Sequence, residues 1–213
     1  MKIERIVNQP MDVNTYVVID DERCLIIDPS FNNSELINLI EMEELEVKAV
    51  VLTHAHFDHM ISVNTICHMY DVPLYIHQKE VGFLYDGQKN LSAFFVRDNE
   101  VVITDRISVR TLDEKTTEIE GFPVKIYHVP GHSPGSVALY FEKDKVVISG
   151  DALFKQSIGR TDFEGGSFEL LRKSIHEKLF VLPDETVVYP GHGPETSIGT
   201  EKSTNPFVGI INQ

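Results

Sequence analysis

The feature that most constrains this chain is a short run of metal-binding residue types at positions 53–59. The run reads Thr-His-Ala-His-Phe-Asp-His, so three imidazoles and one carboxylate, from His54, His56, Asp58 and His59, fall within six positions. It directly follows the apolar residues 49–52, which indicate a buried strand. Because alternate residues of an extended segment point the same way, we expect His54 and His56 to face one ion. Asp58 and His59 then face elsewhere and can serve a second ion.

A polar loop that is rich in histidine by chance is the alternative interpretation of this run. The chain holds nine histidines in 213 residues, and three of them gather at these six positions. Such a concentration favours a metal site over a chance cluster.

Composition excludes several classes of protein. The length of 213 residues suits one domain, and a hydrophobic fraction of 42% is that of a globular protein. Lys and Arg number 19 against 33 Asp and Glu, and the resulting net charge of −14 would repel a nucleic-acid backbone. No stretch approaches the roughly 20 apolar residues of a membrane helix, and the N-terminus lacks the apolar core of a signal peptide. We therefore expect a cytoplasmic protein that binds neither nucleic acid nor membrane.

The two cysteines, Cys24 and Cys67, are isolated from each other in the sequence. Each lies in apolar surroundings, the first strand-like and the second helix-like. Two such thiols form neither a disulfide framework nor a paired-cysteine metal motif. We predict that both are buried structural residues.

The first half of the chain predicts a sheet that changes from antiparallel to alternating strands and helices. Strands are predicted at 3–7, 16–19, 24–27, 47–52 and 74–76. Helices are predicted at 61–70, at 80–85 and after Ser34, which can cap a helix with apolar positions Leu36, Ile37, Leu39 and Ile40. Turn residues separate the first three strands, which we expect to be antiparallel. The later alternation of strand and helix is typical of parallel pairing.

The second half predicts a further sheet. An aromatic-rich loop or short helix is predicted at 91–97, antiparallel strands at 101–103, 107–112 and 124–129, and more strands at 136–141, 146–149 and 186–189. Ser167 is the predicted N-cap of an amphipathic helix that carries Leu170, Leu171 and Ile175. Both halves run from strands to a helix, so we expect two sheets packed face to face with helices outside.

Seven candidate metal ligands follow apolar strands along the whole chain. They are His54, His56, Asp58, His59, His132, Asp151 and His192. One catalytic zinc takes about three side chains and a water, so seven nitrogen and oxygen donors suit two ions that share a bridging carboxylate. Pro and Gly surround His132 and His192, and tight turns fix the backbone from which a ligand projects. The set therefore predicts a dinuclear site.

These motifs resemble the metallo-β-lactamase superfamily. The resemblance rests on the HxHxDH run at 54–59 and on Gly131-His132, Gly150-Asp151 and Gly191-His192, and it covers nearly the whole chain. Residues 129–136 and 159–162 resemble the glyoxalase II group, the hydroxyacylglutathione hydrolases, more than true β-lactamases. A β-lactamase of the family usually has cysteine or serine where this chain has Asp151.

The resemblance implies an α/β fold, the αββα metallo-β-lactamase sandwich, with two mixed sheets face to face and helices on both outer sides. It also implies two divalent metal ions, zinc in the first place, with iron or manganese as alternatives. His54, His56 and His132 would hold the first ion, and Asp58, His59 and His192 the second. Asp151 would bridge them. Asp28, an early aspartate after a strand, matches the residue that supports the site from behind; it could also start a turn with Pro29.

The activity implied by the resemblance is hydrolysis of a small-molecule thioester. Water on a catalytic zinc has its pKa lowered to about 7, so hydroxide held between two ions is the expected nucleophile. Asp58 would ligate the second ion and orient this hydroxide. A thiol with a pKa of about 8.5 leaves without a dedicated general acid, which suits a thioester. Arg160 is a candidate contact for a substrate carboxylate, with an exposed structural arginine as the alternative.

Three other functions remain open at this point. A persulfide dioxygenase shares the fold but binds one iron through two histidines and one aspartate, so Asp58, His59 and His192 would be idle. A nuclease of the superfamily is disfavoured by the acidic charge, and a non-catalytic binding module by the complete ligand set.

The C-terminal part of the chain departs from full-length glyoxalase II. The glyoxalase II group has a C-terminal helical segment whose basic residues grip glutathione, whereas Lys202 alone is basic after His192. The resemblance is therefore closest to a short branch in which residues 1–213 form a single domain. Thioesters other than lactoylglutathione stay open, as does the oligomeric state.

Overall fold

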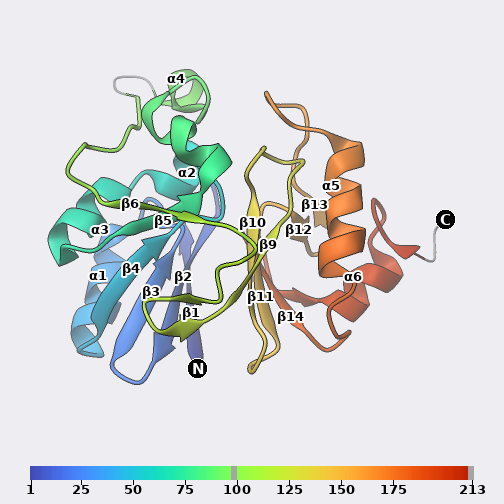
Figure 1. The fold of residues 1–213 in the computed structure, drawn as a ribbon, viewed down its shortest axis with the longest axis horizontal. Coiled ribbons are helices and arrows are strands. Elements are labelled where there is room, and N and C mark those ends of the chain that lie inside the picture. Colours follow the sequence, from blue (N-terminus) through green and yellow to red (C-terminus); the bar gives the residue numbers. More distant parts are fainter. Residues whose placement is uncertain (97–99, 211–213) are drawn as a thin grey trace. The chain divides into compact units, whose positions relative to one another are not determined.

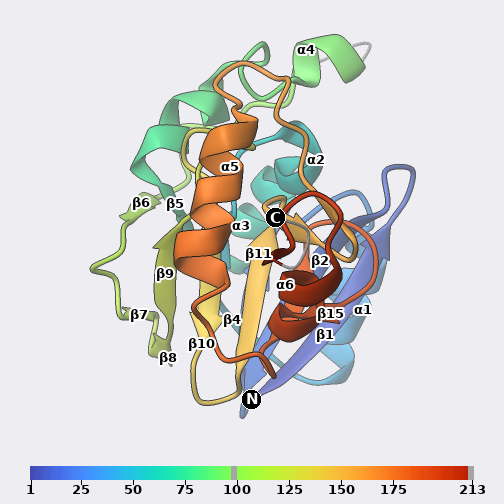
Figure 2. The same ribbon diagram turned by 90° about the vertical axis from the view of Figure 1, so that its right-hand side faces the viewer.

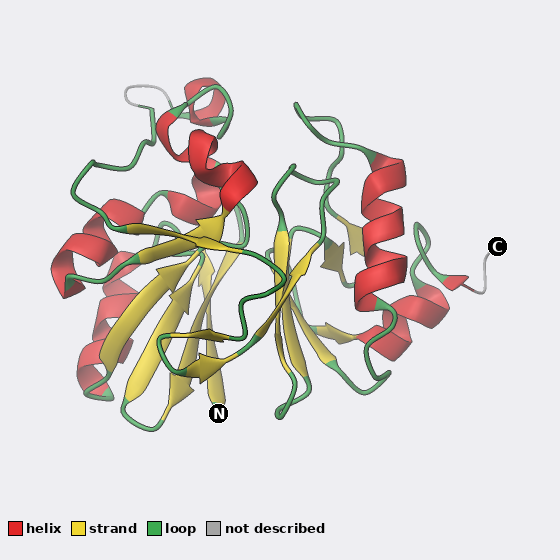
Figure 3. Cartoon of the chain, viewed as in Figure 1, coloured by secondary structure: helices red, strands yellow, loops and turns green. Residues whose placement is uncertain are grey.

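The chain divides into two compact units. The structure is a computed structural model that describes residues 1–96 and 100–210. Unit 1 is Met1–Leu112 and unit 2 is Asp113–Gln213, and each is described by itself. Each unit consists of a β-sheet with helices (Figures 1 and 3). The expectation of a single domain over residues 1–213 stays a prediction.

Unit 1 is built on a six-stranded mixed sheet in the order β1-β2-β3-β4-β5-β6. Its strands are β1 Lys2–Asn8, β2 Val13–Asp20, β3 Arg23–Ile27, β4 Glu46–Val51, β5 Leu74–His77 and β6 Val109–Leu112. The first three strands pair antiparallel, as predicted, and the pairs from β3 to β6 are parallel. Parallel neighbours need crossover connections, and the helices of unit 1 lie in these connections.

The helices of unit 1 differ from the predicted ones mainly at their starts. They are α1 Asn33–Met42, α2 Phe57–Met60, α3 Val63–Tyr70, the 3-10 helix η1 Gln78–Tyr85 and α4 Ser92–Phe95. Ser34 is not the cap of α1, because the side chain of Asn32 accepts the Glu35 N–H. Asn caps a helix as well as Ser does, so the residue type alone could not decide between them. The aromatic-rich segment predicted at 91–97 contains α4, and its last residue, Arg97, lies outside the described residues.

Two predictions for the segment before β6 were wrong. Residues 101–103 form no strand. The Ile103 N–H donates instead to the Leu84 carbonyl oxygen at 2.9 Å, and the Ile103 side chain is buried in the core. The next strand, β6, is parallel to β5 rather than antiparallel. The chain reaches β6 through the crossover that contains η1 and α4, and a crossover returns it in the parallel direction.

The core of unit 1 lies where α1 and α3 pack against buried strand residues. Leu36 and Ile40 of α1 are one helical turn apart and belong to the same buried cluster as Val50 and Leu52. Truncating a fully buried leucine such as Leu52 to alanine costs about 2–5 kcal/mol. Because Leu52 directly precedes the ligand run, this packing anchors the start of the run.

Unit 2 is built on a five-stranded mixed sheet in the order β15-β14-β11-β10-β9. Its strands are β9 Lys125–His128, β10 Val137–Phe141, β11 Val146–Gly150, β14 Val187–Pro190 and β15 Thr196–Ser197. β11 and β14 are parallel, and the other neighbouring pairs are antiparallel. Two small two-stranded sheets are made by β7 Glu118–Ile119 with β8 Phe122–Pro123, and by β12 Leu153–Phe154 with β13 Ser157–Ile158. The strands predicted at 124–129, 136–141, 146–149 and 186–189 are confirmed as β9, β10, β11 and β14.

The helices of unit 2 are α5 Phe168–Ser174, its π-helical continuation η2 Ile175–Leu179, and α6 Ile198–Thr204 (Figure 2). Ser167 caps α5 by accepting the Leu170 N–H, as predicted. Leu171, Ile175 and Leu179 are fully buried in the cluster that also contains Val147 and Val188. Among the helices of the described residues, none combines the length and apolar character that crossing a membrane requires.

Both cysteines are buried in unit 1, as predicted. Cys24 lies in β3 and Cys67 in α3, and neither forms a disulfide. Burial raises the pKa of each thiol to about 12. The thiols are therefore protonated at neutral pH and are poor metal ligands where they lie.

Candidate metal centre

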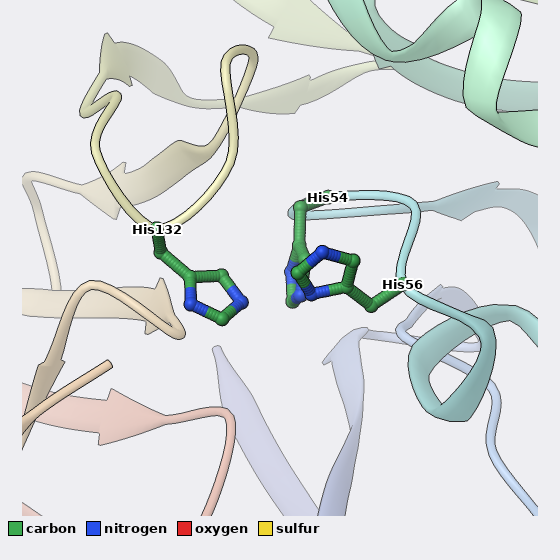
Figure 4. A group of neighbouring side chains, drawn as sticks. All are labelled: His54, His56 and His132. Atoms are coloured by element: carbon green, nitrogen blue, oxygen red, sulfur yellow. The ribbon is translucent and has the colours of Figure 1, made fainter. Parts of the chain in front are cut away.

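The ligand run of unit 1 leaves β4 and turns into α2. His54, His56, Asp58 and His59 are all buried, and His56 is the N-cap residue of α2. The rings of His54 and His56 are nearly perpendicular, at 85°, with centroids 4.7 Å apart (Figure 4). The His54 and His59 ring centroids are 4.3 Å apart. The three imidazoles of the run therefore converge.

The donor atoms of this run lie about as close together as two ligands of one metal ion do. Donor atoms of His54 and His56, of His54 and His59, and of Asp58 and His59 lie within 4.8 Å of each other. The closest approach of Asp58 Oδ2 to His59 Nε2 is 3.9 Å. Two ligands of one zinc, each about 2.1 Å from it, are at most about 4.2 Å apart. The assignment of these residues to particular ions stays a prediction.

Asp28 orients two of the imidazoles. Its Oδ2 accepts the Nδ1–H of His59 at 2.9 Å and the hydroxyl of Thr53 at 2.7 Å. The Thr53 oxygen in turn accepts the Nδ1–H of His54 at 3.1 Å. A proton on Nδ1 leaves the lone pair on Nε2, which is the form of imidazole that ligates a metal. Asp28 therefore orients the imidazoles of His54 and His59, and its support of a bound metal stays a prediction.

The backbone at Asp28 is held in an uncommon conformation. Its φ is 52°, a left-handed value that is uncommon outside glycine, although aspartate adopts it more readily than most residues. Its carbonyl oxygen accepts the Thr15 hydroxyl at 2.7 Å, its N–H donates to the Val51 carbonyl at 3.0 Å, and Oδ1 accepts the Thr53 N–H at 2.8 Å. Asp28 thus both turns the chain after β3 and supports the site.

Glu80 is a supporting residue that was not predicted. Its side chain is fully buried on η1, and Oε2 accepts the N–H of Ala55, between His54 and His56, at 3.1 Å. An acidic residue in a short helix is usually solvated, which is why its type gave no signal. Glu80 and Leu84 are the buried residues of η1, but a 3-10 helix has three residues per turn, so their spacing of four marks no common face in the sequence.

The ligands of unit 2 lie at strand ends. Asp151 follows β11 and His192 follows β14, two parallel neighbours whose carboxyl ends meet at one sheet edge. The Gly191 N–H donates to the Gly150 carbonyl oxygen at 2.8 Å and joins the two turns. Asp151 Oδ2 is 3.5 Å from His192 Nε2. The fold thus brings together two ligands that are far apart in the sequence.

His132 completes the cluster of unit 2. It lies on the turn after β9 and is the third side chain drawn in Figure 4. Its Nδ1–H donates to the Arg160 carbonyl oxygen at 2.8 Å, and its Nε2 is 3.6 Å from Asp151 Oδ2. One carboxylate oxygen thus lies close to the Nε2 atoms of two imidazoles of the same unit, and a bridging role for Asp151 stays a prediction.

Two glycines allow the close packing around His132. Gly131 has φ 133°, and a Cβ there would lie 2.3 Å from the Leu171 nitrogen. A Cβ on Gly159 would lie 1.8 Å from the Asp151 carbonyl oxygen and 3.1 Å from His132 Nδ1. In the sequence, Gly159 stands out only as part of residues 159–162, which carry the resemblance to the glyoxalase II group. Its steric role depends on a contact that the sequence does not reveal.

Arg160 presents its guanidinium to solvent. Nε and Nη2 donate to the two carboxylate oxygens of Asp162 at 2.9 and 2.7 Å, and the group lies 4.1 Å from the Phe163 ring centroid. This pairing raises the pKa of Arg160 and lowers that of Asp162. The contribution of Arg160 to the site is its carbonyl oxygen on His132. Contact with a substrate carboxylate stays a prediction.

Within each unit, taken by itself, the residues present fit metal binding. Each unit holds buried imidazole nitrogens and carboxylate oxygens, and hydrogen bonds on Nδ1 orient its histidine side chains. Neither thiol belongs to these clusters. Nitrogen and oxygen donors of this kind suit zinc, iron and manganese.

A comparison with known families agrees with the site. The family described as the metallo-beta-lactamase superfamily matches residues 8–192. The chain belongs to this superfamily. The match extends over the ligands of both units, from His54 to His192, so the superfamily accounts for the order in which they occur.

Two curated relatives match almost the whole chain. "Probable metallo-hydrolase YqgX" of Bacillus subtilis is 40% identical over 209 residues, which are 98% of this chain and 98% of the relative. "Hydroxyacylglutathione hydrolase GloC" of Haemophilus influenzae is 34% identical over 210 residues, again 98% of each chain.

Two solved structures of metallo-beta-lactamase fold are also similar. The BLEG-1 B3 metallo-beta-lactamase superposes with a TM-score of 0.91 at 40% identity, over 97% of this chain and 99% of that one. TTHA1623 in a di-iron-bound form superposes with a TM-score of 0.84 at 35% identity, over 96% and 99%. The predicted fold class, α/β with two mixed sheets and helices, is confirmed. Family and His/Asp clusters together identify a metal-dependent hydrolase.

Proposed function

We propose that this chain is a dinuclear metal-dependent hydrolase that cleaves a small-molecule thioester of the hydroxyacylglutathione kind. The observation that carries the proposal is the size of the donor set, because unit 1 offers four donors and unit 2 three, more than one ion requires. The name of the 34% identical relative, a hydroxyacylglutathione hydrolase, supports the substrate class. The name of TTHA1623 in its di-iron-bound form supports two ions.

The proposed ligands divide between two ions. His54, His56 and His132 would hold the first, Asp58, His59 and His192 would hold the second, and Asp151 would be shared by both. The distances of 3.5 and 3.6 Å from Asp151 Oδ2 to His192 and His132 Nε2 support the bridging role. Zinc is the proposed native metal, with iron and manganese as alternatives. When bound, the ions supply Lewis acidity that favours the ionisation of water and polarises a substrate carbonyl.

The proposed roles of the side chains are to orient the metal ligands and the attacking water. Asp28 and Thr53 keep Nε2 of His54 and His59 available as ligand atoms. The Asp58 carboxylate accepts a hydrogen bond from the attacking water and so orients it toward the carbonyl carbon. The leaving thiolate, with a parent pKa of about 8.5, departs without a protonated side chain. Arg160 remains the proposed contact for a substrate carboxylate. This carboxylate would compete with the Asp162 side chain for the Arg160 guanidinium.

Metal analysis and an activity screen test this proposal. We expect elemental analysis of the purified protein to find close to two transition-metal ions per chain and zinc-loaded protein to release thiol from S-lactoylglutathione without oxygen. At most one ion per chain after reconstitution with excess zinc would contradict the dinuclear site. Oxygen uptake with glutathione persulfide by iron-loaded protein, together with no cleavage of any thioester, would favour a persulfide dioxygenase instead.

β-Lactam hydrolysis is a second candidate function. It is favoured by the similarity to the BLEG-1 B3 metallo-beta-lactamase, at 40% identity over 97% of this chain. Asp151, where a β-lactamase of the family usually has cysteine or serine, argues for the thioester. Parallel assays of zinc-loaded protein with nitrocefin and S-lactoylglutathione decide between them. The net charge of −14 supports a small-molecule partner rather than a nucleic acid, and the cytoplasm is the proposed location.

A further inference from the structure

Two neighbouring phenylalanines of unit 1 are exposed to solvent. Phe94 is 70% exposed and Phe95 55%, and both belong to the four-residue helix α4 (Figures 1 and 2). Phenylalanine is ordinarily a core residue, and a pair at adjacent positions forms a local apolar surface. We refer to Phe94 and Phe95 as the aromatic pair.

The aromatic pair is joined directly to the ligand run. The Phe95 ring stacks on the Phe57 ring, with centroids 5.7 Å apart and planes 13° from parallel. Phe57 lies between His56 and Asp58, and its N–H donates to the Asn90 carbonyl oxygen at 2.9 Å. The stack therefore joins the aromatic pair to the backbone segment that carries the ligand run.

The segment that carries the aromatic pair is fixed by hydrogen bonds. The Asn90 side chain is buried and donates to the carbonyl oxygens of Phe83 and Val101, at 3.0 and 2.6 Å. The Ser92 hydroxyl oxygen accepts the Val101 N–H at 2.9 Å. The two rings are thus presented from a held backbone, so a ligand that contacts them does not have to order the segment first.

We propose that the aromatic pair binds the apolar acyl group of the substrate and makes the enzyme prefer thioesters with longer acyl chains. This inference rests on the proposed thioester hydrolysis. A small group is favoured as occupant because two phenylalanines bury at most roughly 500 Å² together, below the about 800 Å² per partner of a stable protein interface. A net charge of −14 also disfavours an anionic membrane surface.

A series of acyl thioesters of N-acetylcysteamine, from acetyl to octanoyl, tests the proposal on metal-loaded protein. Because this thiol is neutral, only the acyl chain varies. A fully buried methylene contributes about 0.8 kcal/mol, so on a partly open surface we expect kcat/KM of the wild type to rise about twofold per methylene. Phe95→Ala should lose about tenfold on the octanoyl thioester and less than about twofold on the acetyl one.

Phe207→Ala is the matched control, because Phe207 is a similarly exposed phenylalanine, at 52%, that lies outside α4. It should behave as the wild type along the whole series. Phe94→Ala should flatten the series in the same direction as Phe95→Ala. Equal losses on acetyl and octanoyl thioesters, or an unchanged dependence on chain length in both variants, would overturn the proposal.

Calorimetry separates this proposal from the proposed function. S-alkyl thioethers of N-acetylcysteamine cannot be hydrolysed, so their affinity reports recognition alone. If no thioester is cleaved but affinity rises with alkyl length and falls in Phe95→Ala, the proposed function fails and the apolar site stands. Affinity that is independent of alkyl length, or binding of neutral phosphatidylcholine vesicles that Phe95→Ala abolishes, would overturn the inference.

Discussion

The two units hold their candidate ligands in different ways. In unit 1 the four ligands lie within residues 54–59, and side chains from other elements orient them, Asp28 after β3 and Glu80 on η1. In unit 2 the three ligands are spread from residue 132 to residue 192 and are positioned by backbone groups, the carbonyl oxygens of Arg160 and Gly150. A compact ligand run thus depends on buried carboxylates, whereas a dispersed set depends on close backbone contact.

The largest effect is expected from a ligand of the compact run. Asp58→Asn keeps the shape of the side chain but removes the charge that helps hold an ion and orient water. Turnover of S-lactoylglutathione should fall by about 10²–10⁴-fold, the range of general acid–base contributions, while circular dichroism stays that of the wild type. If the variant retains most of its activity with a full metal complement, Asp58 is neither a ligand nor an orienting group.

The dispersed set should be most sensitive to added volume. In Gly159→Ala the new Cβ would lie 1.8 Å from the Asp151 carbonyl oxygen, so the Asp151 turn must move. A displacement of about 1 Å at a catalytic site can cost 10²-fold, and we expect a loss of that order in kcat. Gly82→Ala is the control, since its Cβ would meet nothing within 4 Å. Equal behaviour of the two variants would mean that the close approach at Gly159 is unimportant.

The two supports of the compact run should differ in strength. Both carboxylate oxygens of Asp28 accept hydrogen bonds, so Asp28→Asn, which turns one oxygen into an NH2 donor, leaves either the Thr53 N–H or the pair His59 Nδ1–H and Thr53 hydroxyl without an acceptor. The loss of such a partner typically lowers metal affinity 10–100-fold. Glu80→Gln keeps an oxygen that can accept the Ala55 N–H, so a few-fold change is expected. Competition with a chelator, read by metal content rather than by activity, measures both. A larger effect at Glu80 would reverse this order.

The smallest effect concerns the thiols, which lie in unit 1 but outside its ligand set. With pKa values of about 12, Cys24 and Cys67 should react with a disulfide reagent at pH 8 only as fast as the protein unfolds. Divided by the fraction of unfolded protein, the rate of thiol reaction should be the same for metal-loaded and metal-stripped protein. Fast reaction of folded, stripped protein would show that a thiol had been protected by metal.

The same pKa values predict a dependence of stability on pH. A thiol whose pKa is raised from 9.0 to about 12 on folding contributes stability that is complete below pH 9 and is lost as the pH rises toward 12. The expected slope is about 1 kcal/mol per pH unit for each thiol. Denaturant unfolding of the wild type and of Cys24→Val between pH 8 and pH 10.5 measures it. Parallel stability curves for the two proteins would contradict the prediction.

The sequence by itself determined the residue types of the site and the strands that precede them. The imidazoles and carboxylates at 54–59, 132, 151 and 192 follow strands that hydrophobic patterning identified, because burial of a strand imposes a pattern on adjacent residues. Ser167 could also be identified as a cap from the sequence, because its capping hydrogen bond is local and joins residues three positions apart.

Only the tertiary structure decided which residues support the ligands. Three of the supporting contacts join residues whose separation in the chain follows no helical or strand period. They are the hydrogen bond from the Ala55 N–H to Glu80, the hydrogen bond from His59 to Asp28, and the close approach of Gly159 to Asp151. The direction of β6 and the loop at 101–103 were likewise set by a crossover and by packing of Ile103. Local patterning reports burial and periodicity, but a contact between distant segments depends on where the whole fold places them.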